Sequence, residues 1–285
     1  MIIDSHVHCG NSAWGDFTPE YLLNLLGEEV DFAICSNLEG IERAFGKALK
    51  DEKTCNLEML EISKKFPKLK PLAVCQPNLT ENAEVIRELL ENHPEFIGLK
   101  IHPECMKLPA NSEKYDKYLE LARELKKPCL YHSGHIKSRF SSPVLIYEKA
   151  KQFPDVPIIL GHLSTGPKDS HIKAIEIMLE SVKNNDANLY VDVSWIDFAY
   201  ERLSDTMEDT LMLIEALKNT SKGDFTHRIM WATDAPVGAF NQNKDSYKRN
   251  LAVFKQRVLE KFNDEKLLYN LLSGNAMQLY GIRHF

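Results

Sequence analysis

The histidines of this sequence form a pattern that could bind a metal ion. His6 and His8 are separated by one residue in the opening stretch MIIDSHVHCG. A further histidine, His132, lies in YHSG, and Asp234 lies in WATDAP. Imidazole nitrogens and carboxylate oxygens are ligands of zinc, and they also suit manganese, iron and cobalt. A lone histidine is more often a hydrogen-bonded core residue, but these four residues together predict a metal site.

Eight short apolar runs alternate with longer helical patterns, and they must position these side chains. The expected strands are residues 2–8, 30–37, 70–76, 96–102, 128–134, 156–162, 189–195 and 228–234. Apolar residues spaced by three and four predict helices over 81–91, 113–126, 169–182, 206–217, 247–262 and 265–280. The alternation predicts parallel strands in an α/β fold, and eight repeats match a (β/α)8 TIM barrel. An open doubly wound sheet is the alternative, but it usually carries a Gly-rich loop after its first strand.

The polar residues stand at the ends of these runs, where a TIM barrel carries its active site. They are His6 and His8 on the first run, Lys100 and His102 on the fourth, His132 on the fifth, His162 on the sixth and Asp234 on the eighth. Side chains alternate along a strand, so Lys100 and His102 share a face opposite Leu99 and Ile101. The same alternation predicts that Asp4 shares a face with His6 and His8. An inward Lys100 needs a partner or a function.

Composition narrows the class of protein. The chain has 285 residues, of which 44% are hydrophobic and 27% charged, with a formal net charge of −6. Both signs are spread along the chain, which argues against a nucleic-acid partner. The apolar runs are strand-sized, so we expect no membrane segment. The N-terminus has no signal-like pattern, and the six cysteines are scattered. We therefore expect one cytoplasmic domain over residues 1–285.

The strand-end motifs resemble the amidohydrolase superfamily. They are Asp4-Ser-His6-Val-His8, the histidines of YHSG and LGHLSTG, and Asp234 in WATDAP. The resemblance reaches the closing segment SGNAMQLYGI and is greatest to the amidohydrolase-related branch that includes aminocarboxymuconate semialdehyde decarboxylase. It implies that His6, His8, His132 and Asp234 are the metal ligands. His162 would bind a second metal in binuclear members, or act in catalysis in mononuclear ones.

This resemblance favours one divalent metal, zinc before manganese, iron or cobalt. The alternative is a second metal bridged by a carboxylated Lys100. Asp234 would take a proton from the activated water, and His162 would stabilise charge on the attacked oxygen. Asp4 would orient a ligand imidazole, or would merely satisfy hydrogen bonds at the barrel floor.

The expected substrate is a small molecule, and the candidates for binding it are Lys100, His102 and Arg139. A buried lysine with a loop arginine would suit a carboxylate or another anion. Trp14 and Trp195 could wall an apolar pocket.

Three functions follow from this site. The leading one is a metal-dependent hydrolase that attacks a C–N or C–O bond. The same residues would also serve a lyase, either a non-oxidative decarboxylase or a hydratase. A non-catalytic binding barrel is the third, and homo-oligomers are common in this superfamily.

Overall fold

The computed structural model describes the chain except residues 13–14, 42, 45–46, 195–202, 238–242 and 284–285. Its main sheet has nine strands in the order β11-β10-β9-β8-β7-β6-β3-β1-β2, of which all but β2 run parallel. The parallel strands are β1 (Ile3–Ser12), β3 (Phe32–Asn37), β6 (Leu69–Val74), β7 (Gly98–Ile101), β8 (Cys129–Tyr131), β9 (Ile158–Leu160), β10 (Leu189–Asp192) and β11 (Ile229–Met230). Each overlaps one of the eight predicted runs, although β1 continues four residues past its run to Ser12 and β6 begins one residue before its run, at Leu69. The antiparallel strand β2 (Gly15–Phe17) ends the sheet, and β4 (Arg43–Ala44) pairs with β5 (Lys47–Ala48).

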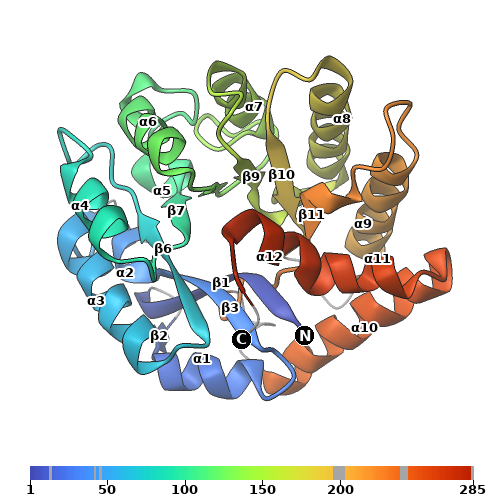
Figure 1. Cartoon of the computed structure of the whole chain (residues 1–285), viewed down its shortest axis with the longest axis horizontal. Helices are drawn as coiled ribbons and strands as arrows, with labels where there is room; N and C mark the ends of the chain where they lie inside the picture. Colours follow the sequence, from blue (N-terminus) through green and yellow to red (C-terminus); the bar gives the residue numbers. More distant parts are fainter. Residues whose placement is uncertain (13–14, 42, 45–46, 195–202, 238–242, 284–285) are drawn as a thin grey trace.

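Helices surround this curled sheet, and Figure 1 shows most of them following the strands in chain order around its outside, whereas α12 lies over the centre in this view. They are α1 (Pro19–Leu26), α2 (Leu38–Ile41), α3 (Glu52–Lys65), α4 (Glu84–Asn92), α5 (Pro103–Met106), α6 (Asp116–Leu125), α7 (Pro143–Gln152), α8 (Lys168–Asn184), α9 (Leu203–Lys218), α10 (Lys244–Phe262), α11 (Glu265–Tyr269) and α12 (Asn275–Tyr280). The single helix predicted over 265–280 is interrupted by a π-helical turn at Asn270–Gly274. Among the residues that the structure describes, no helix is long and apolar enough to cross a bilayer.

Backbone hydrogen bonds join β1 to the segment that follows β11. The amide of Ser5 donates to the carbonyl of Trp231 at 3.2 Å, and the amide of Asp234 donates to the carbonyl of His6 at 2.8 Å. The amide of His8 donates to Ala235 at 2.7 Å. These bonds bring the ends of β1 and β11 together, and with them the side chains of His6, His8 and Asp234.

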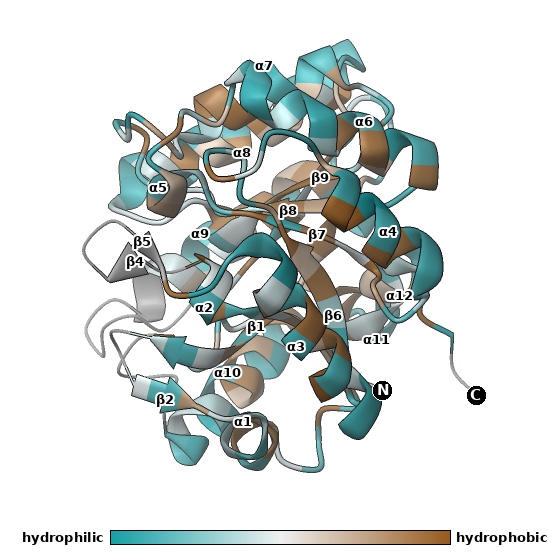
Figure 2. Ribbon diagram, turned by 90° about the vertical axis from the view of Figure 1, so that its left-hand side faces the viewer, coloured by the Kyte–Doolittle hydropathy of each residue, from teal (hydrophilic) through white to brown (hydrophobic). Residues whose placement is uncertain are grey.

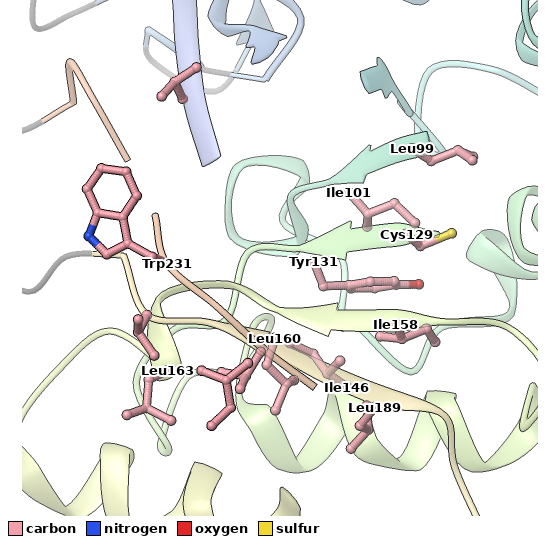
Figure 3. Close-up of a cluster of buried hydrophobic side chains, with 14 of the residues drawn as sticks. Leu99, Ile101, Cys129, Tyr131, Ile146, Ile158, Leu160, Leu163, Leu189 and Trp231 are labelled. Atoms are coloured by element: carbon pink, nitrogen blue, oxygen red, sulfur yellow. The ribbon is translucent and has the colours of Figure 1, made fainter. Parts of the chain in front are cut away.

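The two faces of the sheet pack against different partners. Leu99, Ile101 and Tyr131 belong to the large cluster between the sheet and the outer helices, which Figure 3 shows in close-up. Leu130 and other alternate strand residues form a smaller inner cluster with Tyr280 of α12. Figure 2 shows the central strands as mostly hydrophobic and the helices as hydrophilic on much of their surface. The prediction that Leu99 and Ile101 face the helices is therefore confirmed.

A β-bulge in β1 overturns the prediction that Asp4 shares a face with His6 and His8. The pairing between β1 and β3 shifts register between Asp4 and Val7. Ile3 consequently packs in the inner cluster, whereas Val7 packs in the outer one. The extra residue of a bulge breaks the strict alternation of side chains. Asp4 thus faces the outer helices, while His6 and His8 face the interior.

Candidate metal centre

Three buried side chains meet between β1 and the segments that follow β9 and β11. A nitrogen of His6, a nitrogen of His162 and a carboxylate oxygen of Asp234 all lie within 4.8 Å of one another. Among the described residues, this is the group of histidine, cysteine and acidic side chains with the spacing of a metal site. His8 and His132 adjoin it, so the five predicted residues of the centre lie together.

His6 is held by hydrogen bonds at both ring nitrogens. Its Nδ1 lies 3.0 Å from Oδ2 of Asp192, and its Nε2 lies 2.5 Å from Nζ of Lys100. A carboxylate only accepts, so Nδ1 is the protonated nitrogen and Nε2 carries the lone pair. That lone pair faces Lys100 and Asp234, whose Oδ1 lies 3.4 Å from Nε2.

His8 also has a partner at each ring nitrogen, but its proton lies on Nε2, which donates to the carboxylate of Asp234, and its Nδ1 accepts from a hydroxyl. Its Nδ1 lies 2.9 Å from the hydroxyl of Ser36 on β3, and its Nε2 lies 3.0 Å from Oδ1 of Asp234. The bulge described above turns this imidazole toward the interior together with His6. Asp234 therefore lies between the two histidines of the H-x-H pair.

His162 lies in the short 3-10 turn Gly161–Leu163 after β9, with a left-handed φ of 69°. Its backbone amide donates to Oδ1 of Asp192 at 2.9 Å. Its Nδ1 lies 2.7 Å from the hydroxyl of Ser194, and its Nε2 lies 3.0 Å from Nδ1 of His132. His132 reaches the centre through this contact.

His132 also stacks on His102, with ring centroids 3.9 Å apart and planes 10° apart. His102 caps α5, because its Nδ1 accepts the amide of Cys105 at 3.2 Å. Burial and the nearby Lys100 ammonium lower the pKa of His132 to about 3. Burial likewise lowers the pKa values of His6 and His8. Neutral imidazoles are the form that binds a cation.

Two charged groups of opposite sign lie among these rings. Burial lowers the pKa of Lys100 to about 8, and the carboxylates of Asp234 and Asp192 oppose that shift. Burial also raises the pKa of Asp234, and Lys100 opposes it. The inward lysine predicted from the sequence therefore has its partners, and Asp234 is a carboxylate suited to accepting a proton.

The predicted Arg139 lies at the rim of a neighbouring pocket rather than in the centre. The pocket has a volume of about 340 Å³, and His132, Glu104 and Arg139 are among its lining residues. Arg139 is exposed, and its guanidinium lies 5.5 Å from the ring centroid of Phe140. An anion in this pocket would lie between the loop arginine and His132 of the centre. Trp14 and Trp195 lie outside the described residues.

Asp4 does not orient a ligand imidazole, which corrects one of the two predicted roles. Its carboxylate accepts from the hydroxyl of Thr233 at 2.6 Å and from the hydroxyl of Tyr247 at 2.8 Å. The residue that holds His6 is Asp192, which the sequence analysis did not select. Asp192 ends β10 in LYVDVS, so the strand-end rule that found Asp234 would have found it as well.

The donor set fits a divalent cation. His6 and His8 each have Nδ1 occupied by a partner and Nε2 directed at Asp234. Such outer partners are what fix the ring orientation of metal-binding histidines. The surrounding burial keeps the imidazoles neutral, and Asp234 supplies the negative charge.

The chain is similar to known proteins at the level of the family and of the fold. A protein-family model described as amidohydrolase matches residues 3–282. No match was found among curated proteins.

Solved structures similar to this chain include enzymes of different reaction types. A probable 2-pyrone-4,6-dicarboxylic acid hydrolase from Acinetobacter baumannii, with citric acid bound, is 17% identical, with a TM-score of 0.67 and 99% of each chain covered. A 4-oxalomesaconate hydratase from Rhodopseudomonas palustris is 14% identical, with a TM-score of 0.61 and coverage of 99% of this chain and 96% of that one. A 5-carboxyvanillate decarboxylase from Novosphingobium aromaticivorans, complexed with manganese, is 12% identical, with a TM-score of 0.60 and the same coverage. At these identities the likeness concerns the fold.

Proposed function

Because the chain belongs to the amidohydrolase family and is an enzyme of that superfamily, we propose that it is a metal-dependent hydrolase of a C–N or C–O bond. The observation that carries this proposal is the meeting of His6, His162 and Asp234 at one buried point. We also propose that the curled sheet is a closed (β/α)8 TIM barrel formed by one domain over residues 1–285. The bonds between β1 and the segment after β11 support the closed barrel.

We assign the cation to His6, His8, His132 and Asp234, with His162 beside them. One divalent ion, zinc before manganese, iron or cobalt, fits this set of nitrogen and oxygen donors. When bound, the ion would lower the pKa of a coordinated water to about 7. The alternative, a second ion bridged by carboxylated Lys100, would require Lys100 to leave the contact that its ammonium makes with His6.

The chain's own residues would handle the proton and the developing charge. Asp234 would accept the proton of the water at a carboxylate oxygen and pass it to the leaving group. His162 would stabilise charge on the attacked oxygen. The buried surroundings support both roles, because electrostatic interactions are stronger where water is excluded.

We propose a small, carboxylate-bearing substrate for this site. Lys100, His102 and Arg139 are the residues assigned to bind it. The pocket that joins His132 to Arg139 supports this choice. So does the citric acid bound in the hydrolase of similar fold.

A lyase is the second candidate, because the solved structures of similar fold include a decarboxylase and a hydratase. The branch that contains aminocarboxymuconate semialdehyde decarboxylase would favour this reaction. The same imidazole and carboxylate groups would then polarise an unsaturated or aromatic acid.

For the cellular setting we propose a cytoplasmic enzyme with no nucleic-acid or membrane partner, which could form a homo-oligomer. Six cysteines without disulfides support a reducing compartment. The negative net charge supports the absence of a nucleic-acid partner.

The test is a product analysis in ¹⁸O-labelled water. Protein purified without chelator is analysed for bound metal and incubated with a panel of lactones, amides and aromatic or unsaturated acids. A hydrolase cleaves the C–N or C–O bond and places one ¹⁸O in the cleavage product, whereas a hydratase adds one ¹⁸O without cleaving the substrate. Asp234→Asn should abolish the turnover. Release of carbon dioxide without label would contradict the hydrolase and favour the decarboxylase. Absence of stoichiometric metal, with no gain on adding zinc or manganese, would contradict the metal dependence.

A further inference from the structure

The carboxylate of Asp192 connects two of the site histidines that come from different strands. Asp192 is 1% exposed and ends β10, between β9 and β11. Its Oδ2 accepts from Nδ1 of His6, and its Oδ1 accepts the backbone amide of His162. The proposed hydrolysis does not use this carboxylate as a metal ligand or a proton acceptor.

Ser194 extends this connection to the ring of His162. The hydroxyl of Ser194 donates to Oδ1 of Asp192, and its amide donates to the same oxygen at 3.1 Å. A serine hydroxyl has one proton, and the carboxylate has none to return. The oxygen of Ser194 must therefore accept from Nδ1 of His162, at 2.7 Å.

The direction of the remaining contact follows. With its proton on Nδ1, the neutral ring of His162 carries its lone pair on Nε2. That nitrogen then accepts from Nδ1–H of His132, at 3.0 Å. The donors thus run from His132 through His162 and Ser194 to Asp192, and a separate bond runs from His6 to Asp192.

We propose that Asp192 is a positioning residue that fixes both His6 and His162 in the Nδ1–H tautomer. His6 then presents the lone pair of Nε2 to the centre of the site, where a cation would need it. His162 turns the lone pair of its Nε2 toward His132, and its Nδ1–H lies 4.0 Å from Oδ2 of Asp234. The carboxylate also holds the backbone of His162, which adopts the left-handed conformation that non-glycine residues rarely take. The consequence for cation binding rests on the proposed function, but the tautomers do not.

Asp192→Asn is the direct test, because asparagine has nearly the same size. Its carbonyl can still accept the amides of His162 and Ser194, but its NH₂ group would face Nδ1 of His6. His6 would have to accept there, which moves its proton to Nε2 and toward Lys100. Loss of such an outer partner typically weakens metal affinity by about 10–100-fold.

The first readout is the tautomeric state of each histidine in metal-free protein, measured by ¹H–¹⁵N NMR on ¹⁵N-histidine-labelled samples. We expect Nδ1–H for His6 and His162 in the unsubstituted chain and Nε2–H for His6 in Asp192→Asn. The second readout is zinc affinity, measured by competition with a chromophoric chelator, where Asp192→Asn should bind about 10–100-fold more weakly.

Asp209→Asn is the matched control. Asp209 is also buried and lies 2.8 Å from Nδ1 of His171, in a contact between α8 and α9. This variant loses an equivalent pair away from the site, so the tautomers of His6 and His162 and the zinc affinity should be unchanged. Ser194→Ala is a second test variant in case Asp192→Asn does not fold. It should release the tautomer of His162 and leave that of His6 unchanged.

The outcomes separate this inference from the proposed function. If the unsubstituted chain binds no zinc but Asp192→Asn changes the tautomer of His6, the positioning role stands and the metal dependence fails. If Asp192→Asn keeps the original tautomers and the original zinc affinity, the positioning role is refuted and the metal dependence stands. An unchanged His162 tautomer in Ser194→Ala would refute the relay through Ser194.

Discussion

The hydroxyl of Tyr118 on α6 stabilises a buried carboxylate on α3, and removing it should cost stability in a pH-dependent way. Glu52 is 3% exposed, and its Oε2 accepts from Tyr118 at 2.5 Å and from the amide of Gln76 at 2.7 Å. Its Oε1 is buried without a hydrogen-bond partner among the described residues. Tyr118→Phe would remove the side-chain donor at 2.5 Å and leave this carboxylate with the amide of Gln76 and the hydroxyl of Thr80.

The magnitude follows from the charge state of Glu52. A hydrogen bond to a charged group contributes about 1.5–3 kcal/mol, and one between neutral groups contributes about 0.5–1.5 kcal/mol. Burial raises the pKa of Glu52, so the folded protein holds this proton more tightly than the unfolded chain does. Stability is therefore lost as the pH rises from the unfolded pKa of Glu52 through its folded pKa. Removing the Tyr118 donor raises the folded pKa further, and the loss becomes larger.

Urea unfolding of Tyr118→Phe at pH 5 and pH 8 measures this difference. We expect a loss of about 1.5–3 kcal/mol at pH 8 and a smaller loss at pH 5. Tyr131→Phe is the matched control, because the Tyr131 hydroxyl is buried without a hydrogen-bond partner among the described residues. The free energy of unfolding of Tyr131→Phe should be unchanged or slightly higher at both pH values. Equal losses for Tyr118→Phe at the two pH values would refute the reasoning.

Three further predictions concern other parts of the chain. Asp116→Asn should destabilise the protein by up to about 3 kcal/mol, because it leaves the fully buried ammonium of Lys149 without the carboxylate 2.5 Å away. Lys149→Met should destabilise the protein less than Asp116→Asn does. A smaller decrease in melting temperature for Asp116→Asn than for Lys149→Met would contradict this. Gly98→Ala should cost about 1–3 kcal/mol in urea unfolding, since its Cβ would lie 2.7 Å from the Pro128 carbonyl oxygen; an unchanged midpoint would refute this. Elemental analysis should find metal content nearly unchanged in Lys100→Ala and lowered in His132→Ala, whereas loss of half the metal from Lys100→Ala would indicate a bridged pair.

The strands could be predicted from the sequence because each is a short, strongly apolar run between helical patterns. The helix α3 was missed because its buried face includes Glu52, Asn56 and Ser63, which break the apolar stripe that marks a helix. The helix α7 was missed for the same reason, because its buried face includes the charged residue Lys149. Tertiary partners of these polar groups decide their burial, and those partners are distant in the sequence.

The members of the candidate centre could be predicted, but not their mutual contacts. The rule that polar residues gather at the carboxyl ends of parallel strands was enough to select His6, His162 and Asp234. Hydrogen-bond partners depend on how the strands are staggered and on local turns. The left-handed turn at His162 aims that ring, and no residue spacing indicates that His132 lies against it rather than beside Asp234.

The β1 bulge has a consequence for anyone who would transplant the H-x-H motif into another scaffold. In a regular strand, side chains two residues apart point to the same face. If β1 were regular, the inward Ile3 would therefore be followed by an inward Ser5 and an inward Val7. The extra residue of the bulge shifts the alternation by one, so Ile3 and the imidazoles of His6 and His8 all point inward from one continuous strand. If His6-Val7-His8 were grafted at the same positions of a regular strand in which residue 3 points inward, both imidazole rings would point outward. Deleting Ser5 here would instead remove the bulge and leave Ile3, His6 and His8 on one face of a regular strand.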